Sequence, residues 1–74
     1  MSKLRPAKPR EVARVLERLG FILERQSGSH ALYRHPDGRR TTVPMHHGRD
    51  VARGTLRQIL RDVGLSPEEF EAQR

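Results

Sequence analysis

Two segments of the chain place apolar residues three or four positions apart, the spacing of an amphipathic helix. In the first segment these residues are Val12, Val15, Leu16 and Leu19. In the second segment they are Leu56, Ile59, Leu60 and Val63. We therefore predict two helices, each with one apolar face that packs on a shared core.

Signals at the ends of these segments bound the helices. Lys8-Pro9-Arg10 opens the first helix with proline in its first turn, where the missing N–H loses no partner. Thr55 is the expected N-cap of the second helix. Gly20 and Gly64 follow the two apolar sets and predict left-handed helix ends. Ser66-Pro67-Glu68-Glu69 has the form of a capping box, which predicts a short third helix.

The segment between the two helices has the alternation and the turn residues of β-strands. We predict three strands, over residues 21–26, 29–34 and 39–43. Ser27-Gly28 forms the first turn, and His35-Pro36-Asp37-Gly38 forms the second. Pro44 ends the last strand because it lacks a ladder donor.

This order of elements predicts an α+β fold with the sequence α-β-β-β-α. A three-stranded antiparallel sheet carries two helices on one face, and a short C-terminal helix follows. We expect a single domain over residues 8–72 and a flexible basic N-terminus over residues 1–7. The sheet face away from the helices must then be polar or bind a ligand. A helix-turn-helix module is excluded, because it needs helices where this chain has strands.

Charge and composition narrow the class of partner. The 74 residues carry 15 Lys+Arg against 9 Asp+Glu, a net charge of +6, and thirteen of the cations are arginine. The planar guanidinium matches phosphate oxygens, which favours a nucleic acid, although an acidic protein would respond to the same field. The absence of cysteine excludes disulfides and thiol catalysis. No membrane span or signal peptide is visible, so we expect a cytoplasmic protein.

Six short motifs follow one another in a fixed order along the chain. They are Leu19-Gly20-Phe21, Gly28-Ser29-His30, Tyr33-Arg34-His35-Pro36-Asp37-Gly38-Arg39-Arg40, Val43-Pro44-Met45-His46, Gly54-Thr55-Leu56-Arg57-Gln58-Ile59-Leu60-Arg61 and Gly64-Leu65-Ser66. Their order and spacing resemble those of the HicA family of toxins, which are mRNA interferases, and the resemblance covers residues 8–70. The chain departs from the family pattern at Met45 and at His46-His47, where we expect an aliphatic residue and a small or polar one.

The resemblance implies a fold similar to the double-stranded-RNA-binding domain. It also implies cleavage of mRNA by a single histidine on a strand, which maps onto His30. A HicB-like antitoxin is implied as the partner that covers this site. The toxin–antitoxin complex of such systems often represses its own operon, so operator DNA is a partner only indirectly, through the antitoxin complex.

RNA cleavage without a metal needs a base for the 2′-hydroxyl, an acid for the leaving 5′-oxygen and positive charge near the phosphate. Imidazole exchanges protons near neutral pH, so His30 is the candidate catalytic residue, as either base or acid. Alternation along the middle strand places His30 on the same face as Arg34. The candidate RNA-binding residues are Ser29, Arg34, Arg39, Arg40, Arg10 and Arg14.

The remaining histidines have two interpretations. His46 and His47 either provide a second proton-transfer group and RNA contacts or are solvated loop residues, and we favour the solvated loop. His35 precedes a proline in a turn and is expected to be structural. A histidine-only metal site needs three well-placed imidazoles, and we expect neither a metal nor a cofactor.

Two other functions fit the same sequence. A non-catalytic RNA-binding module of this fold would need the arginines but not His30. An inactive subunit that helps a partner to bind DNA is the third possibility. The arginines spaced four residues apart on the two predicted helices fit an RNA backbone, an acidic antitoxin or simply solvent.

Overall fold

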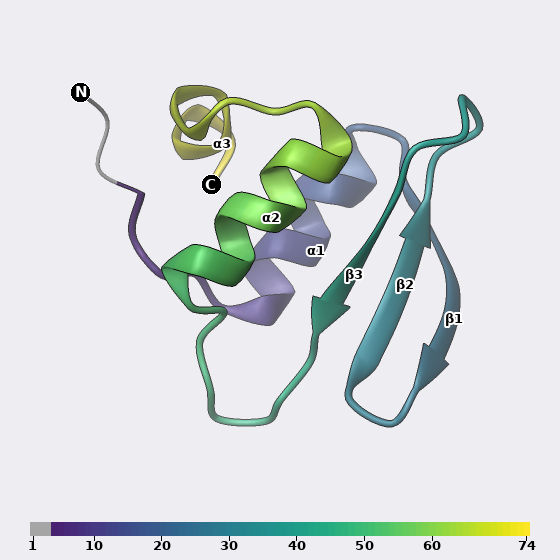
Figure 1. Ribbon diagram of the computed structural model, residues 1–74, viewed down its shortest axis with the longest axis horizontal. Helices are drawn as coiled ribbons and strands as arrows, with labels where there is room; N and C mark the ends of the chain where they lie inside the picture. Colours follow the sequence, from purple (N-terminus) through teal and green to yellow (C-terminus); the bar gives the residue numbers. More distant parts are fainter. Residues whose placement is uncertain (1–3) are drawn as a thin grey trace.

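Six elements follow one another along residues 4–74, the part of the chain that the computed structural model describes (Figure 1). They are α1 (Pro9–Arg18), β1 (Ile22–Ser27), β2 (His30–Arg34), β3 (Arg40–Pro44), α2 (Arg53–Val63) and α3 (Pro67–Gln73). The order and the antiparallel sheet confirm the predicted α+β fold class, with the arrangement of a double-stranded-RNA-binding domain.

The sheet is a meander in which β2 lies between β1 and β3. Figure 1 shows α1 and α2 on one side of the sheet, next to β3, and β1 farthest from both helices. The five-residue connection between β2 and β3 pairs Arg34 with Arg40, and the register then places Pro44 opposite His30. This register matters for the site, because it brings the segment that follows Pro44 beside the start of β2.

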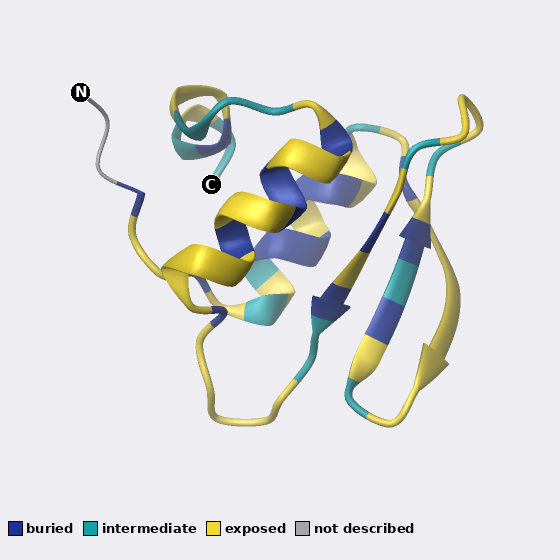
Figure 2. Ribbon diagram, viewed as in Figure 1, coloured by how far each residue is buried: buried dark blue, intermediate teal, exposed yellow. Residues whose placement is uncertain are grey.

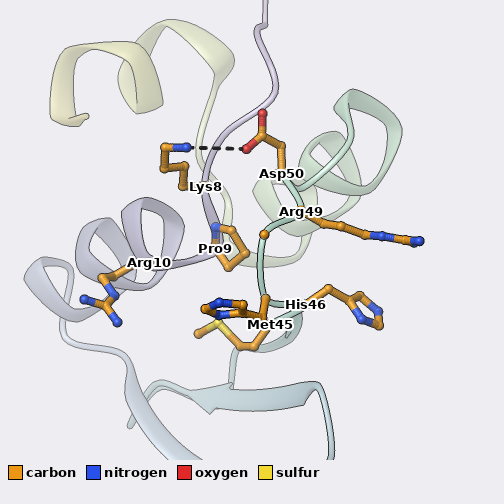
Figure 3. Close-up of a pocket in the computed structure, with 9 residues that line it drawn as sticks. Lys8, Pro9, Arg10, Met45, His46, Arg49 and Asp50 are labelled. Atoms are coloured by element: carbon orange, nitrogen blue, oxygen red, sulfur yellow. Dashed lines mark ion pairs between the residues drawn. The ribbon is translucent and has the colours of Figure 1, made fainter.

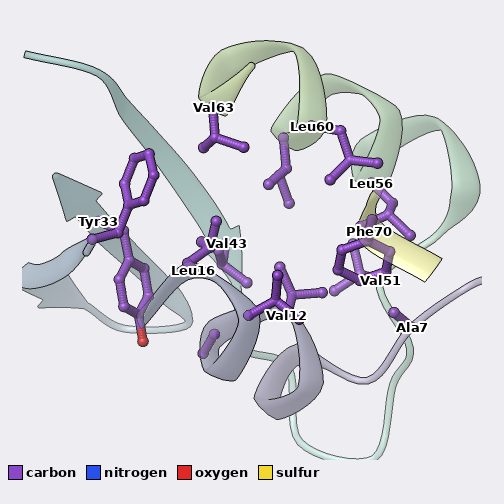
Figure 4. Packing of buried hydrophobic residues seen from close by; sticks show 14 of the residues in the cluster. Ala7, Val12, Leu16, Tyr33, Val43, Val51, Leu56, Leu60, Val63 and Phe70 are labelled. Carbon is purple, nitrogen blue, oxygen red and sulfur yellow. The ribbon is translucent and has the colours of Figure 1, made fainter. Parts of the chain in front are cut away.

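The core lies between the helices and the inner face of the sheet (Figures 2 and 4). Both helices bury the apolar faces that their spacing predicts. Alternation in β2 buries Ala31 and Tyr33 and leaves His30 and Arg34 exposed. From α3, Phe70 completes the core with only 1% of its surface exposed.

Residues 4–7 differ from the flexible terminus that we expected. Leu4 and Ala7 are buried in the core. Ala7 also forms an isolated antiparallel bridge with Val51, in which its N–H and carbonyl bond the Val51 backbone at 3.3 and 2.7 Å. The Arg74 guanidinium also donates hydrogen bonds to the carbonyls of Arg5 and Pro6, so apolar and polar contacts together hold this segment. The rest of that expectation, over residues 1–3, lies outside the described residues.

The predicted helix ends at Gly20, Gly64 and Ser66 agree with the structure, and the one at Thr55 does not. Gly20 and Gly64 adopt φ angles of +96° and +76°, the left-handed conformation that glycine accepts without steric cost. Ser66 forms the predicted capping box at the start of α3. The prediction that Thr55 caps α2 is wrong, because the helix begins at Arg53 and Ala52 takes the N-cap position in an extended conformation without a side-chain acceptor.

Strand β1 is exposed along its whole length, unlike the other two strands (Figure 2). Ile22 and Leu23 keep 64% and 44% of their surface accessible to solvent. The pairing with β2 shifts register between Leu23 and Arg25, so Glu24 is the extra residue of a β-bulge.

Candidate active site

His30 is the first residue of β2 and follows a two-residue turn. Gly28 has a φ of +58°, and no residue other than glycine has a positive φ within residues 4–74. A left-handed glycine in the first central position is the arrangement of a type II′ hairpin turn. The turn leads into β2 with Ser27 and Pro44 opposite His30. The imidazole is therefore exposed on a strand that is paired on both sides.

The loop over residues 45–50 passes beside this turn. The Met45 N–H donates a hydrogen bond to the carbonyl of Ser29, the residue before His30. The ring of the next residue, His46, lies 6.4 Å from the His30 ring between centroids, at an angle of 78°. The structure thus brings together two imidazoles that are sixteen positions apart in the sequence.

A groove of about 530 Å³ opens between this loop and the start of α1 (Figure 3). Its lining includes Arg10, Met45 and His46, and an ion pair between Lys8 Nζ and Asp50 Oδ1 at 3.9 Å joins its two sides. A second hollow of about 320 Å³ shares Arg10 and Met45 with the first and continues along α1 past Arg14 to Glu17. These volumes lie in the lower part of the range of about 300–1,000 Å³ that is typical of ligand pockets.

Arg10 lines both hollows and Arg14 lines the second one. Neither forms an ion pair within residues 4–74, and both are exposed on α1. Figure 3 shows the guanidinium groups of Arg10 and Arg49 pointing to opposite sides of the groove. The cationic side chains that line the groove together with His46 come from the start of α1 and from the loop.

Arg34 and Arg40 lie on the same sheet face as His30 but at its other end. Four residues at about 3.3 Å each separate Arg34 from His30 by ~13 Å along the strand. Arg34 Nη1 pairs with Glu24 Oε1 at 3.4 Å, and Arg40 lies opposite Arg34. The two arginines therefore lie side by side at the end of the outer sheet face away from His30.

Arg39 is held by the protein itself and does not lie with His30. Its Nε donates to Asp37 Oδ2 at 2.8 Å, and its Nη1 donates to the carbonyl of Val63 at the end of α2. The guanidinium also stacks over the Phe21 ring, 5.1 Å from the centroid. The pKa of Asp37 lies below its usual value, mainly because the Arg39 backbone N–H donates a hydrogen bond to the carboxylate and also because of the Arg39 side chain. Arg39 therefore ties the β2–β3 turn to α2.

His35 and Tyr33 occupy structural positions. The His35 ring packs edge-on against Phe21 with the centroids 5.0 Å apart, and its Nδ1 lies 3.1 Å from the Asp37 backbone N–H as an acceptor. Tyr33 is 3% exposed, and burial, followed by the charge of Glu17, raises the pKa of its hydroxyl. Both residues thus support the scaffold around the site.

Comparison with known proteins gives the family. Residues 9–65 match the model of the HicA toxin of bacterial toxin–antitoxin systems, which is more than half of the chain. The chain belongs to the HicA toxin family. No match was found among curated proteins. The matched region contains His30, His46 and all the arginines that we singled out as RNA contacts, and it ends before α3.

Two further observations on this HicA-family toxin concern metal-binding groups and membrane-spanning helices. Within residues 4–74, no group of three or more His, Cys, Asp or Glu side chains is gathered closely enough to bind a metal ion. Over the same residues, none of the helices has the length and hydrophobicity that crossing a membrane would require.

The sequence analysis of this HicA-family toxin did not place His46 beside His30, where the structure has it. The signal was present, because the turn over residues 35–39 fixes the pairing of Arg34 with Arg40. Counting from Arg34 back to His30, and from Arg40 forward to Pro44, pairs Pro44 with His30. The residues after Pro44 must therefore pass close to the turn that precedes His30.

Proposed function

We propose that this HicA-family toxin is an endoribonuclease that cleaves mRNA without a metal ion, with His30 in proton transfer. The observation that carries the proposal is the exposed imidazole on a doubly paired strand, beside a groove lined by an unpaired arginine. A strand holds a catalytic side chain more rigidly than a loop does, and proton transfer depends on a well-fixed distance.

The shape of the site supports RNA as the substrate. The groove is open and shallow, so a long polymer passes through it without entering a closed cavity. Arg10 and Arg14 follow the groove along α1, while Arg34 and Arg40 extend the cationic surface over the outer sheet face. Together with Ser29 at the turn, these side chains hold the phosphate backbone while His30 acts at one phosphate.

A HicB-like antitoxin is the proposed partner. It neutralises the toxin by covering the face that carries His30, and an acidic surface on the antitoxin would pair with the exposed arginines. The protein acts in the cytoplasm, where mRNA is found, and contacts operator DNA only through the antitoxin complex. Expression of the toxin alone should therefore arrest growth, and expression with the antitoxin should restore it.

The deciding experiment compares RNA cleavage by the wild type and by His30→Ala, each with and without EDTA. We expect the variant to lose about a hundredfold to ten-thousandfold in rate, the usual contribution of a general acid or base. EDTA should leave the wild-type rate unchanged. Ala72→Gln changes an exposed residue of α3, away from the groove, and serves as the control.

Three results would contradict the proposal. Full activity of His30→Ala would remove the histidine from the chemistry. Loss of wild-type activity in EDTA would show that a metal is required. RNA binding without any cleavage by the wild type would favour the non-catalytic RNA-binding module instead.

A further inference from the structure

The neighbourhood of His30 contains a second group that can transfer a proton. The His46 ring lies 6.4 Å from the His30 ring, nearly perpendicular to it, and both side chains are exposed. The two rings come from different elements, one from β2 and one from the loop over residues 45–50. Strand cleavage of RNA needs both a base and an acid, and a single imidazole supplies only one of them at a time.

We propose that His46 is a second catalytic residue and that His30 and His46 act as an acid–base pair on one phosphodiester. The inference rests on the proposed endoribonuclease function and adds the group that this function leaves unassigned. In each turnover one imidazole begins neutral and the other begins protonated.

The spacing of the rings fits this role. The attacking and leaving oxygens lie on opposite sides of phosphorus in an in-line displacement. A catalytic nitrogen must come within ~2.6–3.2 Å of the oxygen that it serves. Two such contacts on opposite sides of one phosphate need rings that are separated by a phosphate rather than stacked on each other. A centroid separation of 6.4 Å leaves that gap, whereas rings in direct hydrogen-bond contact would not.

The loop that carries His46 is tied at both ends. At one end the Met45 N–H bonds the Ser29 carbonyl, directly before His30. At the other end Asp50 pairs with Lys8, and Val51 is bridged to Ala7. These contacts fix the path of the loop relative to the strand, which is the condition for a loop residue to act with a strand residue.

Positive charge surrounds the pair. The charged and titratable groups near His46, from its own loop, from the start of α1 and from β2, are Lys8, Arg10, His30, His47, Arg49 and Asp50. Asp50 is paired with Lys8, so the unpaired groups are cationic or neutral. Such a field attracts the phosphate and stabilises the negative charge that builds on its oxygens during the displacement.

The reaction balances with these two groups and needs no other reactant. The neutral imidazole takes the proton of the ribose 2′-hydroxyl, and the 2′-oxygen forms a bond to phosphorus. The bond from phosphorus to the 5′-oxygen breaks, and the imidazolium gives its proton to that oxygen. The products are a 2′,3′-cyclic phosphate and a 5′-hydroxyl, and the two histidines have exchanged protonation states.

The test measures cleavage of one RNA by the wild type, His30→Ala, His46→Ala and Ala72→Gln over a range of pH. We expect His46→Ala to lose at least a hundredfold in kcat/KM and one limb of the bell-shaped pH profile. Ala72→Gln is expected to stay within about threefold of the wild type, because Ala72 is exposed on α3 and makes no transition-state contact. Circular dichroism checks that each variant is folded.

A second substrate identifies the acid of the pair. Sulfur in place of the bridging 5′-oxygen leaves without a proton, so the variant that lacks the acid should regain activity. We expect either His30→Ala or His46→Ala, and not both, to recover on this substrate.

Several outcomes would overturn the inference. A His46→Ala rate within tenfold of the wild type would show that His46 takes no part. A larger loss with both limbs of the pH profile intact, or recovery of neither or both variants on the sulfur substrate, would make His46 a positioning residue at most. If His30→Ala is inactive while His46→Ala is not, the inference fails and the proposed function survives. If the wild type does not cleave RNA, both fail together.

Discussion

Phe70 gives the sharpest test of how this small domain is held together. The helix that carries it, α3, has seven residues and is too short to persist alone. Its attachment combines polar contacts, such as the ion pair between Arg74 and Glu11, with the burial of Phe70, which is 1% exposed and is the largest of the fully buried side chains within residues 4–74. The family match ends at residue 65, so α3 lies outside the matched region although it contributes to the core.

The expected cost of Phe70→Ala follows from its burial. Removing a fully buried phenylalanine costs about 3–5 kcal/mol, because transfer free energy is lost and a cavity remains. A 74-residue domain has a total stability of about 4–11 kcal/mol at ~0.05–0.15 kcal/mol per residue. The substitution therefore removes a large share of the free energy of unfolding. At about 4–8 °C per kcal/mol for a domain of this size, we expect Tm to fall by at least ~12 °C.

Thermal unfolding followed by circular dichroism measures the effect, and urea unfolding gives the free energy independently. Ala72→Gln is the matched control, because Ala72 is exposed on the same helix and surface substitutions stay within about 0.5 kcal/mol. A loss of less than about 1.5 kcal/mol for Phe70→Ala, well under the usual cost of a buried aromatic, would refute the argument that α3 is part of the core.

Two further predictions follow from the hydrogen bonds and charges. The pKa of Glu69 lies below its usual 4.5, first because the Ser66 backbone N–H donates a hydrogen bond to the carboxylate and then because of a hydrogen bond with the Ser66 hydroxyl. The ionised Glu69 therefore stabilises the fold fully above pH 4.5, and this stabilisation is lost as the pH falls through the lowered pKa. Tm should therefore fall less between pH 7 and pH 3 in Glu69→Gln than in the wild type, and equal falls would contradict this reasoning. Arg39→Met should lower Tm and leave RNA affinity unchanged, whereas Arg10→Met should keep Tm and reduce the slope of log K against log salt by about 0.7. A reversed pattern in binding titrations would mean that the two arginines have been assigned to the wrong roles.

The sequence was sufficient for the elements whose signals are local. The apolar spacing of both long helices, the left-handed glycines and the capping box at Ser66 each depend on a few neighbouring residues, and the structure contains all of them. The start of α2 was predicted wrongly because Ala52 takes the N-cap without offering an acceptor. Residues 4–7 were misjudged because their burial depends on the distant Val51 and on the core.

In the candidate site, too, local sequence signals were enough to place some residues and not others. Alternation was enough to place His30, Arg34 and Tyr33 on their faces of the sheet. It was not enough for Arg39, whose partners Val63 and Phe21 belong to other elements. The approach of loop 45–50 to His30 follows from the strand register that the 35–39 turn sets, and the loop sequence alone does not reveal it.

The exposed strand β1 has a consequence for how copies of this chain meet one another. An edge strand with free N–H and carbonyl groups is a template on which another strand can add, and the apolar Ile22 and Leu23 would favour such growth. The bulge at Glu24 breaks the regular spacing of those groups halfway along the edge, and the adjacent Arg25 adds a second charge. A second strand thus meets an interrupted, charged edge, so β1 can stay uncovered without starting edge-to-edge aggregation.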